Sequence, residues 1–363
     1  MIAAPDGRAE RLAAAVADAG LEMAIVGDLV RPGDSGRDAM ADVAWLTGFF
    51  GSSGLAVVGA GTRAFLTDFR YATRAADTVP ESFRVVDATG EIVVELARLL
   101  AGRVGIDPAK TSVECHRKLA EAVGEGVEIV AVGGLVADLR RVKDEAEIAA
   151  IAAAAELADE VYAGIEEGGL AGRTEREVAL AAEARMRELG AEGPSFPTIV
   201  AAGPNAAQPH AVPGEREIGA GEYVIVDMGA ILDGYCSDCT RTLVDGEPDP
   251  GRREVYELVL AAQRAGLEAI RGGVGGRVAD AIAREVIASA GYGERFGHGL
   301  GHGVGIEVHE PPRLSKRSDD VLRAGEVVTV EPGVYVPGEF GIRIEDLVVV
   351  TADGHRNLST YPK

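Results

Sequence analysis

The stretch YVIVDMGAILDGYCSDCTRTLV, residues 223–244, decides how the second part of the chain folds. Two apolar runs flank Asp233–Gly234, a dipeptide that favours the tight turn of a β-hairpin. Asp227 precedes this turn and Asp238 follows it at a similar distance along the chain. We therefore expect their side chains to oppose each other across the two strands. Directly opposed like charges destabilise a sheet. Such a pair indicates bound cations or a protonated carboxyl, unless the register slips and both face water.

The residues on either side of this hairpin predict an α+β domain. Helices are expected over residues 144–166, 174–189, 250–270 and 277–290, and strands over 223–228, 236–244, 327–331 and 342–350. Thr174 and Glu177 form the sequence pattern of a capping box at one helix start. A helix pair followed by antiparallel strands occurs twice, which indicates an internal duplication.

The first part of the chain alternates helices and short strands, which is typical of an α/β domain. Helices are expected over residues 8–19, 91–100 and 112–123, and strands over 23–26, 55–58 and 64–67. The polar stretch 139–144 then opens a long helix rich in Ala and Glu. We place the domain boundary there, which gives domains of residues 1–138 and 139–363. A chain of 363 residues is long enough for two such cores.

Composition excludes several classes of function. The formal net charge of -22 repels phosphate backbones, so we expect no nucleic-acid partner. The chain has only three cysteines, which argues against a disulfide framework. Residues 1–7 lack the basic segment of a signal peptide, and no apolar run reaches the ~18 residues of a membrane span. We therefore expect a cytoplasmic protein that does not bind membranes.

Three of the six histidines lie within FGHGLGHGVGIEVHE, residues 296–310. The glycines between His298, His302 and His309 leave room and freedom in φ, so the imidazoles can converge. The spacing does not match the G-x-G-x-x-G pattern, and no lysine follows as in a phosphate-binding loop. The stretch therefore predicts a metal site or a proton-transfer site.

Two glutamates complete a set of possible ligands. Glu331 ends an apolar strand, and Glu345 shares a strand face with Arg343. A carboxylate among apolar residues must be neutralised, and a local ion pair of Arg343 with Glu345 would explain only those two residues. Two divalent cations balance the four carboxylates and leave an imidazole as a neutral ligand; the set is Asp227, Asp238, His302, Glu331 and Glu345.

Such an oxygen-rich set suits Mn²⁺, Co²⁺ or Zn²⁺, of which we favour Mn²⁺. Two ions a few ångström apart can hold a bridging hydroxide as nucleophile. Cys236 and Cys239 bracket Asp238, but no second cysteine pair exists and their side chains would point to opposite faces of a strand. We interpret both cysteines as packing residues.

The order and motif contexts of these five ligands resemble the pita-bread metallopeptidases, a family that includes methionine aminopeptidase, prolidase and aminopeptidase P. The resemblance implies that Asp227 holds one ion, that Asp238 and Glu345 bridge both, and that His302 and Glu331 complete the second. It also implies roles in the reaction for two further positions, substrate contact by His210 and oxyanion stabilisation by His309, and a second role, proton transfer, for Glu331.

Other residues look like the Xaa-Pro branch of this family, namely His298, Tyr335 and Arg343. Residues 1–138 resemble the creatinase-type N-terminal domain, with Trp45–Phe49 and Leu66–Tyr71 as signatures. The resemblance implies cleavage before proline in dipeptides or longer peptides. Arg343 is the candidate to bind a substrate carboxylate, because a guanidinium binds one bidentately.

Two alternatives stay open at this point. A catalytically inactive binding scaffold on the same fold would usually have lost ligands, and none of the five is missing here. We also expect a homodimer in which the polar segment 31–38 reaches a neighbouring active site; an ordinary solvated loop is the competing interpretation. The sequence does not separate dipeptidase from aminopeptidase activity.

Overall fold

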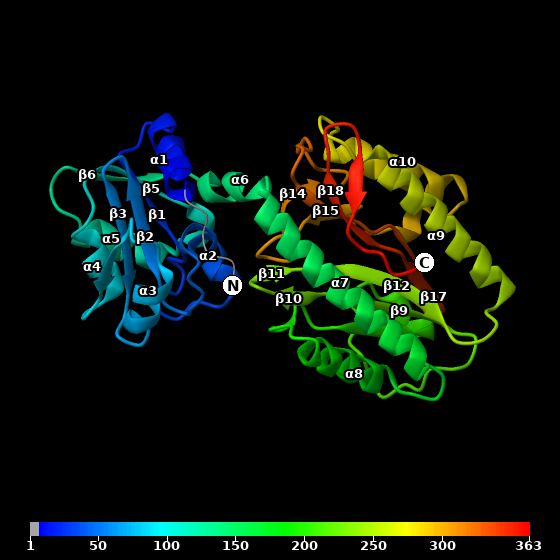
Figure 1. Cartoon of the computed structure of the whole chain (residues 1–363). Helices are drawn as coiled ribbons and strands as arrows, with labels where there is room; N and C mark the ends of the chain where they lie inside the picture. The colour runs from blue at the N-terminus through cyan, green and yellow to red at the C-terminus, as the bar shows by residue number, and fades with distance from the viewer. Residues whose placement is uncertain (1–6) are drawn as a thin grey trace. The chain divides into compact units, whose positions relative to one another are not determined.

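The computed structural model describes residues 7–363 and divides into two compact units, one ending at Arg140 and one running from Arg141 to Lys363 (Figure 1). The division lies beside the boundary predicted at residue 139. Residues 1–6, which carry most of the argument against a signal peptide, lie outside the described residues. No helix in the described part of the chain is long and apolar enough to cross a membrane.

The first unit contains a six-stranded mixed sheet with the order β4-β3-β2-β1-β5-β6. Its strands are β1 (Met23–Val26), β2 (Leu55–Gly59), β3 (Thr62–Thr67), β4 (Arg84–Asp87), β5 (Gly102–Ile106) and β6 (Val127–Ala131). The three predicted strands are confirmed as β1 to β3, and these pair antiparallel. The strands that were not predicted, β4 to β6, are added by parallel pairing at the two sides.

Six α-helices begin among residues 7–140, the described part of the first unit. They are α1 (Arg8–Asp18), α2 (Ala41–Thr47), α3 (Ala72–Thr78), α4 (Ile92–Ala97), α5 (Val113–Ala122) and α6 (Leu135–Arg141), with short 3₁₀ turns η1 (Asp38–Met40) and η2 (Pro108–Lys110). The predicted helices are confirmed as α1, α4 and α5. Segment 31–38 is held within its own unit, because Ser35 Oγ donates to Asp28 and Arg70 donates to the Gly33 carbonyl.

The second unit has two helix pairs, each packed on a sheet (Figure 1). The helices are α7 (Glu145–Gly168), α8 (Glu175–Glu188), α9 (Pro250–Ala269) and α10 (Gly276–Ser289), as predicted. One buried core joins α7 and α8 to β8 and β9, and another joins α9 and α10 to β15 and β18. The predicted duplication is therefore visible as a repeated helix-pair-on-sheet unit. The predicted capping box at Thr174 is also present.

The strands of the second unit form four sheets. Their orders are β11-β10-β7, β12-β9-β8, β14-β13-β15-β18-β19 and β16-β17. The strands are β7 (Gly193–Pro194), β8 (Ile199–Ala202), β9 (Tyr223–Met228), β10 (Ala230–Leu232), β11 (Tyr235–Cys236), β12 (Cys239–Val244), β13 (Gly301–Gly303), β14 (Glu310–Leu314), β15 (Val327–Val330), β16 (Gly333–Val336), β17 (Phe340–Arg343), β18 (Asp346–Val350) and β19 (His355–Asn357); two further 3₁₀ turns are η3 (Gly203–Ala207) and η4 (Gly293–Arg295).

The register of the central hairpin corrects one prediction. Asp233 and Gly234 have φ values of 50° and 86°, so they form the predicted two-residue turn. Pairing runs symmetrically outward from this turn and places Asp227 opposite Thr240. The expectation that Asp227 opposes Asp238 is wrong by two residues, because the true centre of the turn lies between positions 233 and 234.

Two predicted strands are interrupted, and each interruption carries a carboxylate. Asp238 lies between β11 and β12, where the Ser237 carbonyl oxygen comes within 1.9 Å of the place that a Cβ on Gly229 would take. Only glycine tolerates so close an approach. Glu345 lies between β17 and β18 in the same way. The breaks release both acidic residues from regular strand geometry at the place where the two halves of the unit meet.

Candidate metal centre

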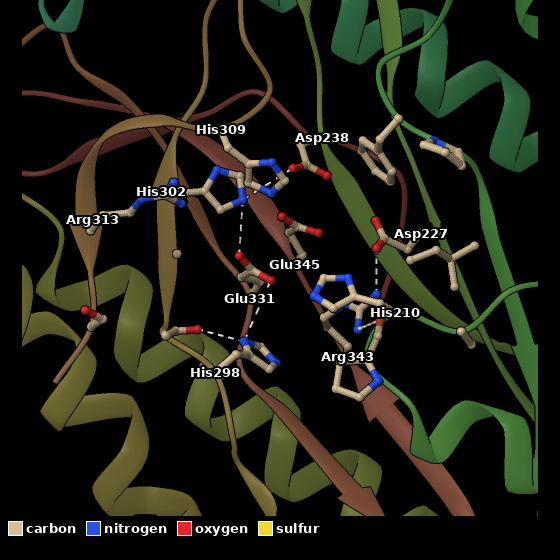
Figure 2. Close-up of a pocket in the computed structure, with 18 of the residues that line it drawn as sticks. His210, Asp227, Asp238, His298, His302, His309, Arg313, Glu331, Arg343 and Glu345 are labelled. Atoms are coloured by element: carbon tan, nitrogen blue, oxygen red, sulfur yellow. Dashed lines mark hydrogen bonds and ion pairs between the residues drawn. The ribbon is translucent and has the colours of Figure 1, made fainter. Parts of the chain in front are cut away.

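A cavity of about 510 Å³ lies in the second unit, between the two halves of the duplication (Figure 2). All the predicted ligands and catalytic residues line it, and they come from elements far apart in the sequence. The predicted residues around the cavity are His210, Asp227, Asp238, His298, His302, His309, Glu331, Arg343 and Glu345. The folded chain thus brings together every residue that the sequence proposed as a metal ligand or catalytic group.

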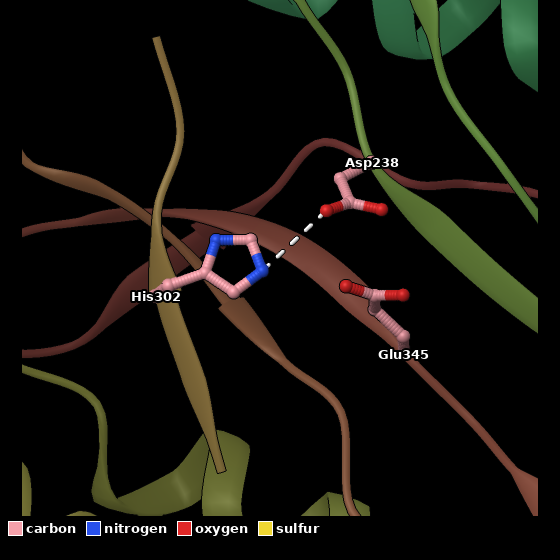
Figure 3. A group of neighbouring side chains, drawn as sticks. All are labelled: Asp238, His302 and Glu345. Carbon is pink, nitrogen blue, oxygen red and sulfur yellow. Dashed lines mark ion pairs between the residues drawn. The ribbon is translucent and has the colours of Figure 1, made fainter. Parts of the chain in front are cut away.

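Three of these side chains form a group with the spacing of metal ligands (Figure 3). One donor atom each from Asp238, His302 and Glu345 lies within 4.8 Å of the others, and all three residues are buried. His302 Nε2 lies 3.5 Å from Asp238 Oδ2 and 3.4 Å from Glu331 Oε1. One imidazole nitrogen therefore faces two carboxylates, an arrangement that a cation would neutralise.

Asp227 has an oxygen available for a cation. Its Oδ2 accepts a hydrogen bond from Arg343 Nη2 at 2.6 Å. Its Oδ1 is buried and has no hydrogen-bond partner among the described residues. An unsatisfied buried carboxylate oxygen is destabilising. A metal ion would remove this penalty, so the donor set fits the predicted divalent ions.

Burial and mutual repulsion oppose ionisation of the acidic cluster. Burial first, and then the neighbouring Glu345 and Asp227, raise the pKa of Asp238 well above its usual range. Burial and Glu331 do the same to the pKa of Glu345. Burial, opposed by Arg343, raises the pKa of Glu331 to about 8. Without cations these carboxyls retain protons, and divalent ions would stabilise the charged forms.

The histidines of the cluster are held neutral, as a metal ligand must be. Burial lowers the pKa of His302 to about 3 and that of His298 to about 4. The Nδ1 of His302 lies 3.1 Å from the Gly303 carbonyl oxygen, which can only accept, so Nδ1 carries the proton. The unprotonated Nε2 then points toward Asp238 and Glu331. This tautomer is the one that can bind a cation.

The glycines of the histidine segment serve close packing. A Cβ on Gly301 would lie 2.0 Å from the Thr329 carbonyl oxygen, and one on Gly303 would lie 2.3 Å from that of Pro311. Neither glycine has a positive φ. Glycine is therefore needed at these positions for lack of space, and not for the conformational freedom that we expected. The close approach lets Thr329 Oγ1 accept from His302 N and donate to Glu331 Oε1.

The guanidinium of Arg343 forms its hydrogen bonds with other residues of the protein. Besides Asp227, its guanidinium donates to Tyr335 Oη at 2.8 Å and to Thr240 Oγ1 at 3.0 Å. The alternative of an Arg343–Glu345 ion pair is wrong, because Arg343 pairs with Asp227 while Glu345 accepts from Thr240 Oγ1 at 2.7 Å. The reason is the break after β17, which ends the alternation expected to put both side chains on one strand face.

The remaining predicted residues lie around the ligand cluster. The His309 ring lies 4.4 Å from the His302 ring, centroid to centroid. His298 Nε2 lies 2.8 Å from Tyr335 Oη. His210 follows η3 and is exposed at the cavity. His210 and His309 line the cavity, whereas both ring nitrogens of His298 are engaged, with the Gly299 carbonyl and with Tyr335 Oη.

Sequence reasoning missed Arg313. This arginine lines the cavity from β14, directly opposite His302 in the strand pairing. In the part of the chain that the structure describes, its guanidinium has no hydrogen bond or ion pair. The burial of β14 alternates, with Arg313 on the exposed face. This alternation could have identified Arg313 from the sequence. However, the prolines Pro311 and Pro312 argue against a strand at this place, so no strand was predicted.

Comparison with known proteins shows the family of both units. Residues 149–352 match the model of metallopeptidase family M24, and residues 8–142 match that of the creatinase/prolidase N-terminal domain. The Xaa-Pro dipeptidase of Pyrococcus horikoshii is 46% identical over 233 residues, which is 64% of this chain and 66% of that protein.

Two solved structures cover almost the whole chain. An Xaa-Pro dipeptidase from Bacillus anthracis is 37% identical with a TM-score of 0.90, over 98% of this chain and 97% of that one. An X-Pro aminopeptidase from Thermotoga maritima is 36% identical with a TM-score of 0.87, over 98% of both chains. The similarity therefore extends over both units.

Proposed function

The chain belongs to metallopeptidase family M24, with a creatinase-type domain before its pita-bread catalytic domain, and on this premise we propose that it hydrolyses Xaa-Pro dipeptides. The reaction requires two divalent ions, for which Mn²⁺ is our candidate. The proposed ligands are Asp227, Asp238, His302, Glu331 and Glu345. The observation that carries the proposal is the buried group of Asp238, His302 and Glu345 beside the unpaired Asp227 Oδ1.

The chain's own residues have distinct tasks in this proposal. Two bound ions would polarise the scissile carbonyl and lower the pKa of a bridging water to give the hydroxide nucleophile. Glu331 lines the cavity beside His302 and is proposed to take up the water proton and return it to the proline nitrogen. His309 and His210 line the cavity and are proposed to support the oxyanion and the bound peptide.

Arg313 favours a dipeptide as substrate. Arg343, the arginine first expected to bind a substrate carboxylate, donates to Asp227, Tyr335 and Thr240. Arg313 lines the same cavity with a free guanidinium, and such a group binds a carboxylate bidentately. In an Xaa-Pro dipeptide the terminal carboxylate lies one residue from the bond that is cut. We therefore transfer the proposed carboxylate-binding role from Arg343 to Arg313.

A comparison of substrates tests this function. The metal-free protein is loaded with Mn²⁺ and assayed with Ala-Pro, Ala-Pro-Gly and Ala-Gly. We expect kcat/KM to be highest for Ala-Pro. Faster cleavage of Ala-Pro-Gly would favour an X-Pro aminopeptidase, the activity named for the Thermotoga maritima neighbour. Absence of cleavage in all three, with no bound metal, would instead support the inactive scaffold. The homodimer and the cytoplasmic location stay predictions from sequence.

A further inference from the structure

The two carboxylates that frame the metal site come from different halves of the second unit. Asp238 precedes β12 and Glu345 precedes β18, and these strands belong to different sheets. We call the junction of residues 240–242 with residues 343–346 the seam. One backbone hydrogen bond crosses it, from Glu345 N to the Thr240 carbonyl at 3.1 Å. The separation of Asp238 and Glu345 therefore depends on the side chains at the seam.

Arg241 provides most of the side-chain contacts on one side of the seam. Its side chain is 1% exposed. Its Nη1 donates to the carbonyl oxygens of Thr240, at 3.1 Å, and of Glu345. Its Nη2 lies 3.1 Å from Asp346 Oδ1. A single guanidinium thus binds the backbone of a proposed metal ligand, the side chain of the next residue and the carbonyl that precedes it on its own strand.

The partners of Arg241 are themselves fixed. Asp346 is fully buried, and its other oxygen accepts from Gln263 Nε2 at 2.9 Å and from Asn357 Nδ2 at 3.0 Å. The Nε of Arg241 donates to the Tyr361 carbonyl at 3.1 Å. A buried ion pair with its hydrogen bonds satisfied contributes little net stability over an apolar pair, but it defines geometry.

The opposite side of the seam is held by two threonines. Thr240 Oγ1 donates to Glu345 Oε2 at 2.7 Å. Thr242 Oγ1 donates to the Arg343 carbonyl at 2.7 Å and accepts from Arg343 N at 3.1 Å. Because strand side chains alternate, Arg241 contacts the seam from the face opposite these threonines. The segment that carries Glu345 is therefore fixed from both faces of β12.

We infer that Arg241 is a positioning residue for the metal centre, acting through the backbone of Glu345. Arg241 and Asp346 are absent from the described lining of the cavity, so neither is placed to touch substrate. By holding Glu345 against Thr240, Arg241 sets the separation of the Asp238 and Glu345 carboxylates and hence the affinity for the ions that they share. This inference rests on the two-metal centre of the proposed function.

Mn²⁺ titration of the metal-free protein by calorimetry tests the inference. The variants are Arg241→Gln and Arg241→Lys, with Arg253→Gln as the control, because Arg253 forms an exposed ion pair with Glu247 at 3.3 Å. We expect two ions in the parent and in the control. Arg241→Gln should bind at least one ion about 10- to 100-fold more weakly, as when a partner of a metal ligand is lost. Arg241→Lys should recover part of the affinity, and excess Mn²⁺ should restore activity.

The outcomes separate this inference from the proposed function. Two ions bound by folded Arg241→Gln with parental affinity would overturn the inference and leave the function standing. No Mn²⁺ bound by the parent would overturn both. If Arg241→Gln does not fold, Arg241→Lys carries the test alone, since it keeps the buried charge but lacks the forked nitrogens that bind the Glu345 carbonyl and Asp346 together. Parental Mn²⁺ affinity in Arg241→Lys would then overturn the inference.

Discussion

At the scale of single residues, the free guanidinium of Arg313 makes the sharpest prediction. Arg313→Gln removes the proposed partner of the substrate carboxylate. A charged hydrogen bond contributes about 1.5–3 kcal/mol, so kcat/KM for Ala-Pro should fall about 10- to 100-fold. The measurement compares Ala-Pro with its C-terminal amide, which lacks the carboxylate. Equal losses on the two substrates would show that Arg313 acts in another way.

The sequence was most informative for these individual residues. Five candidate ligands in recognisable order predicted a site that the fold assembles, because carboxylates and imidazoles are hard to explain in apolar surroundings unless they converge. Arg313 was missed since an exposed arginine carries no such signal. The alternative that paired Arg343 with Glu345 is wrong because the contact of Arg343 with Asp227, 116 positions earlier, is a tertiary one that local spacing does not show.

At the scale of elements, the close approach of β13 and β15 predicts strict intolerance of a side chain at Gly301. In Gly301→Ala the new Cβ would meet the Thr329 carbonyl oxygen at 2.0 Å, so the strands must separate and His302 must move. We expect a loss of about 1–3 kcal/mol in the free energy of unfolding, as for other overpacked sites, together with weaker Mn²⁺ binding.

Gly297→Ala is the matched control for this prediction. A Cβ at Gly297 meets no atom within 4 Å. The free energy of unfolding of Gly297→Ala should therefore differ from that of the parent by less than about 0.5 kcal/mol. Urea denaturation and Mn²⁺ titration of both variants provide the measurement. Equal stability and equal Mn²⁺ affinity in the two variants would contradict the packing argument.

Helices with clear periodicity and caps, such as α8, were predictable from local sequence, whereas the breaks in the strands were not. The interruptions before β12 and β18 depend on close backbone contacts that local alternation does not show, such as that of the Ser237 carbonyl with Gly229. Strands β4 to β6 were missed because their burial is irregular or slight. Local alternation predicts that a strand exists, but tertiary packing decides where it stops.

At the scale of the whole molecule, the acidic cluster predicts a dependence of stability on pH. Glu331 has a pKa of about 8 in the folded protein, against an ordinary value of 4.5. The native state therefore holds a proton that the unfolded chain has lost, and stability falls as pH rises through this interval. The raised pKa values of Asp238 and Glu345 act in the same direction.

His298 and His302 act in the opposite direction, but only at lower pH. Their pKa values are lowered to about 4 and about 3, from 6.5, so their effect is complete once pH exceeds 6.5. Between about pH 6.5 and 8 the metal-free protein should lose stability, by about 1.4 kcal/mol per pH unit for each proton released. Denaturation midpoints in EDTA at several pH values check this. A flat or rising profile would contradict it.

Added Mn²⁺ should reverse this trend. Metal binding requires deprotonated carboxylates, so protons compete with the ions less as pH rises. The stabilisation by a fixed Mn²⁺ concentration should therefore increase between pH 6.5 and 8. The same denaturation series with Mn²⁺ in place of EDTA measures it, and a constant increment across that range would argue against carboxylate ligands.

The central claim is that two ions bind between the halves of the second unit, and anomalous diffraction from Mn²⁺-soaked crystals tests it most directly. We predict two anomalous peaks in the cavity, one touching Asp227 and one touching His302 and Glu331, with Asp238 and Glu345 between them. A cavity without anomalous density at saturating Mn²⁺, or peaks only on other acidic residues, would contradict the account.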